Sequence, residues 1–195
     1  MSLTGSYPPN PTLVEYPHPA LRAKAAPVTI FNDQLRAFCA HLFTVMESHA
    51  GVGLAAPQVA VSKRIFITDH LWRKDGSGGG DRRVFINPVI EQAEGSTSYE
   101  EGCLSFPSIY AKVNRHNRFD LRYQDEHGTA HVTSFDVEAG HFLGIVVQHE
   151  LDHLDGVAFV DHLAPAQLTL IRRKLRDLEG DYKKATGKAG LILRR

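Results

Sequence analysis

The chain has 195 residues, 43% of them hydrophobic and 23% charged, and its 22 Lys and Arg balance its 22 Asp and Glu. This composition is typical of one globular domain, and a net charge of zero gives no general reason to expect a DNA or membrane partner. No apolar run approaches the roughly 18 residues of a membrane span, no secretory signal is visible, and two cysteines make no disulfide framework, so we expect a cytoplasmic protein.

The first fifty residues predict a flexible arm followed by a helix. Residues 1–11 contain several prolines and small polar residues, so we expect a flexible N-terminal arm. Apolar residues recur at spacings of three and four over 33–49, which predicts an amphipathic helix with Asn32 as its N-cap. Cys39 belongs to the apolar stripe of this helix, and we interpret it as a core thiol.

The middle of the chain predicts strands, because β-branched, aromatic and alternating apolar residues dominate it. The expected strands are 64–69, 83–87, 109–113, 119–123 and 129–137. Gly128 marks a hairpin turn before the last of them. The Gly-rich segment 74–82 predicts a flexible loop.

The last third of the chain predicts helices. Residues 140–155 are apolar on nearly every side, which predicts a buried helix that Gly156 would end. A second, amphipathic helix is expected over 165–179, with Pro165 in its first turn. Residues 181–195 predict a flexible basic tail, which leaves one domain over 12–180.

The strongest chemical signal lies in the buried helix. Its segment QHELDH contains H-E-x-x-H, whose histidines, His149 and His153, lie one turn apart on the same helix face. Both rings can bind one metal ion, and Glu150 between them can reach a water bound to that ion. Because burying such groups is costly unless they are paired or bound to metal, the segment predicts a metal site.

A catalytic metal site also needs a third protein ligand and an open position. His162 lies nine residues after His153, and the downstream ligand pattern of zinc peptidases does not follow the motif. Upstream, EGCLS offers Cys103 as a thiolate that could complete a Cys-His-His site. The segment GVGLAAPQ combines glycines that allow close backbone approach with Gln58 as an amide donor, or is simply a helix-ending turn.

Together, GVGLAAPQ, EGCLS and QHELDH resemble the three motifs of the peptide deformylase family, in the same order and at every defined position. Flanking matches extend the resemblance from about residue 12 to residue 178. It implies a single catalytic domain over 12–180 that hydrolyses the N-formyl group of formylmethionyl nascent peptides and releases formate. We expect an α+β fold in which mixed, mostly antiparallel sheets surround a central buried helix carrying H-E-x-x-H, followed by a C-terminal helix.

The resemblance also implies roles for individual residues. The expected metal ligands are Cys103, His149 and His153. Glu150 would be the general acid/base, and the Gln58 amide with the Leu104 backbone N–H would stabilise the oxyanion. The expected substrate-binding residues are Val52, Gly53, Tyr99, Glu101, Gly102, Phe142 and Val146. Arg115 would form an ion pair with Glu101 behind the metal loop.

The family generally uses Fe²⁺, so we expect this ion, with Zn²⁺, Ni²⁺ or Co²⁺ able to replace it in preparations. Many members carry an arginine where this chain has Tyr110, and the loop 74–82 would lengthen a rim of the site. Basic residues at the C-terminal helix suit docking on the ribosome, with a solvated helix face as the alternative. Two other interpretations are an H-E-x-x-H zinc endopeptidase and a non-catalytic, ribosome-associated metal-binding relative.

Overall fold

Two antiparallel sheets frame the part of the chain that the computed structural model describes, residues 7–71 and 80–191. The larger sheet has the strand order β1-β2-β3-β6-β7, and the smaller sheet pairs β4 with β5. The strands are β1 (Gly53–Ala55), β2 (Ile65–Thr68), β3 (Arg83–Glu94), β4 (Thr97–Cys103), β5 (Phe106–Arg115), β6 (Arg118–Gln124) and β7 (Ala130–Asp136). All pairings within these sheets are antiparallel, where mixed and mostly antiparallel sheets were expected.

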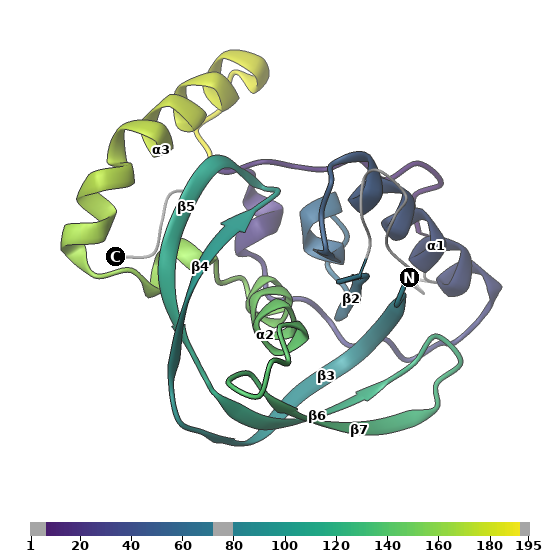
Figure 1. Cartoon of the computed structure of the whole chain (residues 1–195). Helices are drawn as coiled ribbons and strands as arrows, with labels where there is room; N and C mark the ends of the chain where they lie inside the picture. Colours follow the sequence, from purple (N-terminus) through teal and green to yellow (C-terminus); the bar gives the residue numbers. More distant parts are fainter. Residues whose placement is uncertain (1–6, 72–79, 192–195) are drawn as a thin grey trace.

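One helix lies between the sheets, and the others cover the outside (Figure 1). The helices are α1 (Asp33–Ser48), α2 (Leu143–Leu154) and α3 (Pro165–Thr186), with 3-10 turns η1 (Pro19–Arg22), η2 (Ala56–Val59) and η3 (Phe159–His162). Nearly all residues of α2 are buried, which confirms the predicted central helix. In the described part of the chain, no helix is long and apolar enough to cross a membrane.

Local signals in the sequence explain where several elements begin and end. The Asn32 side chain accepts a hydrogen bond from the Leu35 N–H at 3.0 Å, so it caps α1 as predicted. Cys39 is buried in the core, also as predicted. Gly128 and Gly156 have φ values of 86° and 68°, which suit glycine at the β6–β7 turn and after α2.

Two predicted helix boundaries are wrong. α2 begins at Leu143 rather than at residue 140, because Gly140 has a φ of 99°, outside the helical region. α3 passes through Gly180 and ends only before Gly187, whose φ of 70° makes it the terminating residue. Residues 181–186, expected in a flexible tail, are therefore helical.

The described end of the N-terminal arm packs against α1. The Tyr7 ring stacks on Phe38 with centroids 4.6 Å apart, and Pro11 is buried. Residues 1–6 lie outside the described part of the chain. So does most of the predicted loop 74–82, whose contribution to a rim of the site stays a prediction.

Apolar packing on both sides fixes α2 relative to the strands. On one side, Val147 and Leu154 pack with Phe66 and Phe85 of the larger sheet, whose rings stack at 4.7 Å. On the other side, η3 brings Phe159 against the ring of His149, with centroids 5.9 Å apart. The face of α2 that carries the H-E-x-x-H motif consequently meets the end of β4.

Candidate active site

Three potential metal ligands from two elements converge at the end of β4. Cys103 is the last residue of β4, and His149 and His153 lie one turn apart on α2. Their donor atoms lie within 4.8 Å of one another, and Cys103 Sγ is 3.3 Å from His153 Nε2. Tetrahedral ligands at 2.0–2.3 Å from an ion lie roughly 3.4–3.7 Å apart, so these residues fit a divalent metal. One sulfur and two imidazole nitrogens suit a transition metal.

Gln58 lies beside this cluster and is held in place by three contacts. Its Oε1 accepts a hydrogen bond from the Ala55 N–H at 2.8 Å. Its Nε2 donates to Ser105 Oγ at 3.3 Å and lies 3.6 Å from Cys103 Sγ. The side chain is buried, and a residue fixed in this way offers a rigid amide donor next to the metal ligands. Leu104 follows Cys103 in the turn between β4 and β5.

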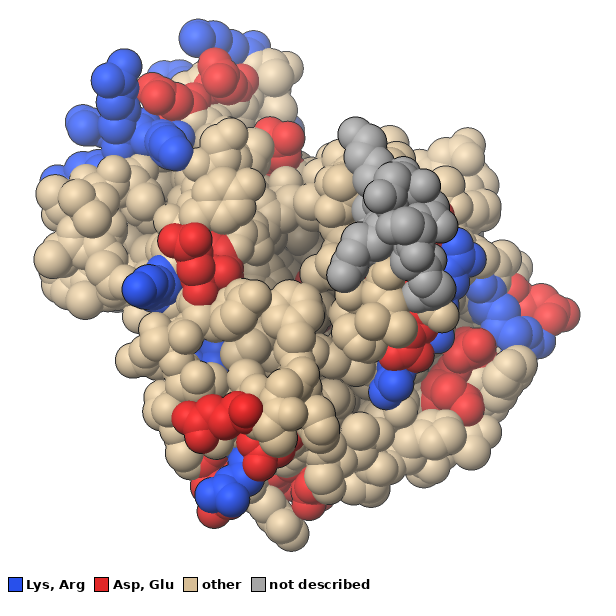
Figure 2. Space-filling view, in the orientation of Figure 1, with Lys and Arg blue, Asp and Glu red and all other residues tan. Residues whose placement is uncertain are grey.

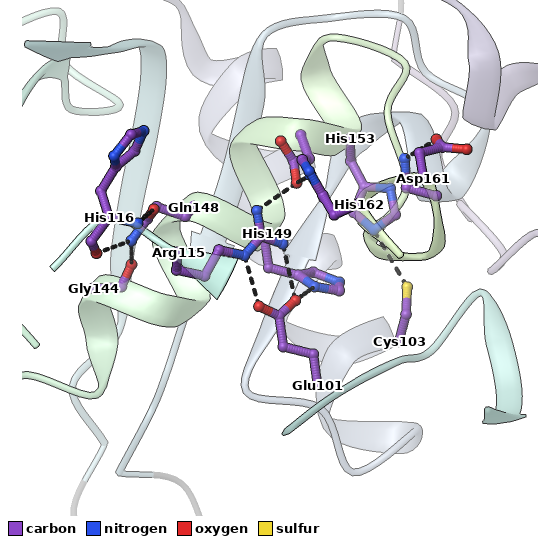
Figure 3. A network of polar contacts seen from close by, with 12 residues as sticks. Glu101, Cys103, Arg115, His116, Gly144, Gln148, His149, His153, Asp161 and His162 are labelled. Carbon is purple, nitrogen blue, oxygen red and sulfur yellow. Dashed lines mark hydrogen bonds and ion pairs between the residues drawn. The ribbon is translucent and has the colours of Figure 1, made fainter. Parts of the chain in front are cut away.

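A network of ion pairs supports His149 from behind (Figure 3). Glu101 Oε2 lies 2.8 Å from His149 Nδ1. The predicted Arg115–Glu101 pair is confirmed, because Arg115 Nε and Nη2 donate to the two Glu101 oxygens at 2.6 and 2.9 Å. Arg115 Nη1 donates to Asp152 Oδ2 at 2.6 Å, and His162 Nε2 lies 2.7 Å from the same oxygen. The contact at Nδ1 leaves His149 Nε2 for a metal.

The network keeps two carboxylates ionised, the buried Glu101 and the partly buried Asp152. Burial alone would raise the pKa of Glu101, but hydrogen bonds from Arg115 and His149 outweigh it and lower the pKa to about 2. Burial likewise opposes ionisation of Asp152, and the His162 and Arg115 contacts lower its pKa to about 2. Buried charges of this kind are tolerated because each has an opposite charge within hydrogen-bonding distance.

Two other titratable groups of α2 have buried atoms that find no hydrogen-bond partner among the described residues. These atoms are Glu150 Oε2 and His153 Nδ1. Burial raises the pKa of Glu150 to about 7. Burial and the neighbouring His149 lower the pKa of His153 to about 3, which keeps this ring neutral and able to bind a metal. An unpaired buried polar atom is costly, and Glu150 Oε2 lies on the residue between the two histidines, where a ligand could satisfy it. His153 Nδ1 belongs to the other side of its ring, away from the Nε2 atom that faces Cys103.

A cleft of about 500 Å³ opens in front of the cluster. All the predicted substrate-binding residues line it: Val52, Gly53, Tyr99, Glu101, Gly102, Phe142 and Val146. The rings of Tyr99 and Phe142 lie 5.4 Å apart and form one apolar wall. Both Glu101 carboxylate oxygens are engaged by Arg115 and His149, so this side chain supports a ligand residue rather than presenting a free charge to the cleft.

Several residues around the site are not predicted by the sequence motifs. Ser105 fixes the Gln58 amide, and Asp152 and His162 extend the ion-pair network to the surface. The spacing of Asp152, three residues after His149 on a helix, was a signal that it would share the neighbouring face. His162 follows the motif at a distance where a downstream metal ligand could lie, but its ring contacts Asp152 instead. Tyr110 lines the cleft with its ring beside Gly102, where an added Cβ would lie 2.6 Å from Tyr110 Cε1.

The sequence is similar to a protein family and to individual proteins of that family over most of its length. The model of the family described as polypeptide deformylase matches residues 11–168. A peptide deformylase of Chromobacterium violaceum is 41% identical over 167 residues, covering 86% of this chain and 95% of that protein. One of Fusobacterium nucleatum is 42% identical over 165 residues, covering 83% and 87% of the two chains.

Solved structures agree with the sequence comparison. A plant peptide deformylase is similar with a TM-score of 0.86 and 34% identity, over 94% of this chain and 97% of the other. A peptide deformylase of Plasmodium falciparum has a TM-score of 0.83 and 36% identity, over 91% and 99% of the two chains.

Proposed function

This chain belongs to the polypeptide deformylase family, the hydrolases that deformylate nascent peptides, and we propose that it carries out this reaction at the Cys103–His149–His153 cluster. The observation that carries the proposal is the convergence of one sulfur and two nitrogen donors beside a buried carboxylate, Glu150, that has an unpartnered oxygen. The products are formate and a peptide with a free N-terminal methionine.

The proposed cofactor is one Fe²⁺ ion held by Cys103, His149 and His153. This donor set also accepts Zn²⁺, Ni²⁺ and Co²⁺, and the resemblance to deformylases that work with iron decides the choice. Bound there, the ion would supply Lewis acidity that polarises the formyl carbonyl and makes a nearby water more acidic.

Glu150 is the proton carrier in this proposal. Its pKa, raised to about 7 by burial, suits a group that accepts a proton from water near neutral pH and later gives it to the leaving amine. A Cβ added to Gly53 would lie 2.5 Å from Glu150 Oε1, so this oxygen lies directly against β1. The proton donor is thus next to the strand where the peptide is proposed to bind.

Two donors would stabilise the negative charge that develops on the formyl oxygen. The Gln58 amide lies beside Cys103 and is held by Ala55 and Ser105, so the N–H that now faces Cys103 Sγ would be the one to donate to the formyl oxygen. The second donor would be the backbone N–H of Leu104, which directly follows Cys103 in the chain.

An extended peptide would bind between two strand edges. β1 is an outer strand of the larger sheet, and β4 pairs only with β5 among the described strands. Gly53 of β1 and Gly102 of β4 both line the cleft, so a peptide lying between them could pair with either backbone as an added strand. The methionine side chain would then enter the apolar part of the cleft formed by Val52, Phe142 and Val146.

Docking on the ribosome through α3 is a separate proposal. Lys and Arg gather over α3 at the upper left of Figure 2, and the exposed residues include Arg172, Arg173, Lys174 and Arg176. A basic helix on a chain of zero net charge suits an RNA-rich partner, and it would keep the enzyme in the cytoplasm near nascent chains. Reversing Arg172 and Arg173 to Glu should reduce cosedimentation with ribosomes at low salt; unchanged cosedimentation would reject the docking surface.

The reaction itself is tested by incubating the protein with formyl-Met-Ala-Ser and measuring formate. We expect formate and intact Met-Ala-Ser in a one-to-one ratio, and no formate after a chelator has removed the metal. A zinc endopeptidase would cleave internal peptide bonds without releasing formate, and a non-catalytic relative would leave the peptide unchanged. Either result would reject the proposed function.

A further inference from the structure

His162 is a partly exposed side chain that touches the metal cluster only through other residues. We propose that His162 is a positioning residue for His149, acting through the series Asp152, Arg115 and Glu101. The inference rests on the proposed metal centre, because it concerns how firmly one of its ligands is held.

The series runs from the surface of η3 to the buried ligand (Figure 3). The exposed fraction of the side chains falls along it, from 36% for His162 and 21% for Asp152 to 4% for both Arg115 and Glu101. Each link is 2.9 Å or shorter, from the His162–Asp152 contact at 2.7 Å to the Glu101–His149 contact at 2.8 Å. The geometry therefore joins a solvent-facing ring to a ligand without a gap.

Asp152 is the point at which His162 acts. Its Oδ2 is hydrogen-bonded to both Arg115 Nη1 and His162 Nε2, so groups from β5 and η3 fix one carboxylate. Arg115 donates to Glu101 through Nε and Nη2, and Glu101 fixes the tautomer and orientation of His149 through Nδ1. Without His162, one side of Asp152 would be held only by water, and the looser carboxylate would give Arg115, and through it the ligand, more freedom.

The fold of η3 does not depend on the His162 ring. Phe159, in the first position of η3, is buried against Phe106 and His149. Asp161 accepts the Ala158 N–H at 2.8 Å and forms an ion pair with Arg22 of η1. Replacing His162 should thus remove its contact with Asp152 and leave the turn in place.

The chain offers a matched control. His131 Nε2 lies 2.9 Å from Asp125 Oδ2, and these side chains are 40% and 25% exposed, close to the values for His162 and Asp152. This second histidine–aspartate pair belongs to the β6–β7 hairpin and has no part in the network of Figure 3. Loss of the His131 ring should therefore cost a similar surface contact without affecting His149.

The measurement is the rate at which a chelator strips Co²⁺ from the loaded protein, followed by the sulfur-to-cobalt absorption band. Replacing the partner of a metal ligand commonly weakens binding by about 10–100-fold, and His162 is further away, so His162→Leu should speed stripping by about three- to ten-fold. His162→Gln, which keeps an N–H donor in this region, should stay within about two-fold of wild type, as should His131→Leu. Thermal unfolding of the metal-free proteins should show that all variants are folded.

A second arm tests the route. In an Asp152→Asn background, adding His162→Leu should change the stripping rate little, because residues that act through one another are not additive. The inference is overturned if His162→Leu loses Co²⁺ at the wild-type rate, or if His162→Gln loses it as fast as His162→Leu. It is also overturned if the effects of Asp152→Asn and His162→Leu on this rate are fully additive. Failure of the metal site itself looks different, because the wild-type protein would then bind no Co²⁺ and show no absorption band.

Discussion

Glu150 joins two properties that rarely coincide, namely nearly complete burial and a carboxylate oxygen without a partner in the described structure. Replacing it by Gln keeps the shape of the side chain and removes its ability to carry a proton. We expect Glu150→Gln to lose about 10²–10⁴-fold in kcat, the usual worth of a positioned acid/base group. Metal content should stay at the wild-type level. A metal-loaded Glu150→Gln protein with near-normal turnover would rule out the proton-carrier role.

At the residue scale, sequence motifs predicted the ligand cluster, the Arg115–Glu101 pair and residues that line the cleft, but not the outer part of the polar network. The i, i+4 spacing fixes His149 and His153 on one helix face, and the EGCLS segment supplied Cys103 by resemblance. The Asp152–His162 contact could not be derived, because it depends on how η3 folds back onto α2. Ser105 is the last residue of EGCLS, but the motif match did not indicate that its hydroxyl would contact the Gln58 amide.

At the element scale, β1 can approach α2 closely only because Gly53 has no side chain. An added Cβ would lie 2.5 Å from Glu150 Oε1 and 2.8 Å from Val146 Cγ1. Gly53→Ala should displace the Glu150 carboxylate and lower kcat by about 10–100-fold, the scale expected for a misplacement near 1 Å.

The control for this change is Gly180→Ala in α3, where an added Cβ meets nothing within 4 Å. This variant should keep full activity and gain about 0.5–1 kcal/mol of stability, since alanine is the better helix former. Deformylation at the wild-type rate by Gly53→Ala would mean that Glu150 has room to move without loss of function.

A second prediction at this scale concerns Val146, an apolar residue of α2 that lines the cleft. Val146 is buried, lines the cleft, and has no polar role. Val146→Trp should fill the proposed methionine pocket and cut kcat/KM for formyl-Met peptides at least about tenfold, with a much smaller loss for formyl-Ala peptides. Equal losses for both substrates, measured by formate release, would show that the methionine side chain binds elsewhere.

The larger periodic elements were predictable, whereas short or polar ones were not. α1 follows from apolar spacing on one helix face, α2 from a segment that is apolar on nearly every side, and five strands from alternating, β-branched or aromatic residues. β1 has only three residues, all buried, so it shows no alternation, and β4 is largely exposed and polar. The end of α3 was misplaced because Gly180 resembles a stop signal, yet an isolated glycine is tolerated inside a helix when no φ above zero is required.

At the scale of the whole molecule, the buried network should make the metal-free protein sensitive to acid. The pKa of Glu101 is lowered from 4.5 to about 2 in the folded state, so its ionised form stabilises the fold above about pH 4.5, and this stability is lost as the pH falls toward 2. Above about pH 4.5, the ionised Glu101 contributes roughly 3 kcal/mol to the free energy of unfolding. Urea unfolding at a series of pH values should show that the free energy of unfolding falls less steeply with decreasing pH for Glu101→Gln than for wild type.

The exposed neighbour provides the comparison for this experiment. Glu100→Gln changes the same kind of side chain on the same strand, outside the network. Its free energy of unfolding should therefore depend on pH as in wild type. If the free energy of unfolding depends on pH equally in wild type and Glu101→Gln, the Glu101–Arg115 pair does not link folding to pH.

The central claim is that this chain deformylates peptides with a metal ion held by Cys103, His149 and His153. The most direct test is formate release per bound metal from formyl-Met-Ala-Ser, measured without oxygen for the Fe²⁺, Ni²⁺, Co²⁺ and Zn²⁺ forms and for Cys103→Ser. We predict an active Fe²⁺ form that decays in air, since oxidation of the iron or of Cys103 destroys the site. Ni²⁺ and Co²⁺ forms should be active and stable in air, and Cys103→Ser should bind all four ions weakly. Full activity in metal-free protein, or in Cys103→Ser, would contradict the account.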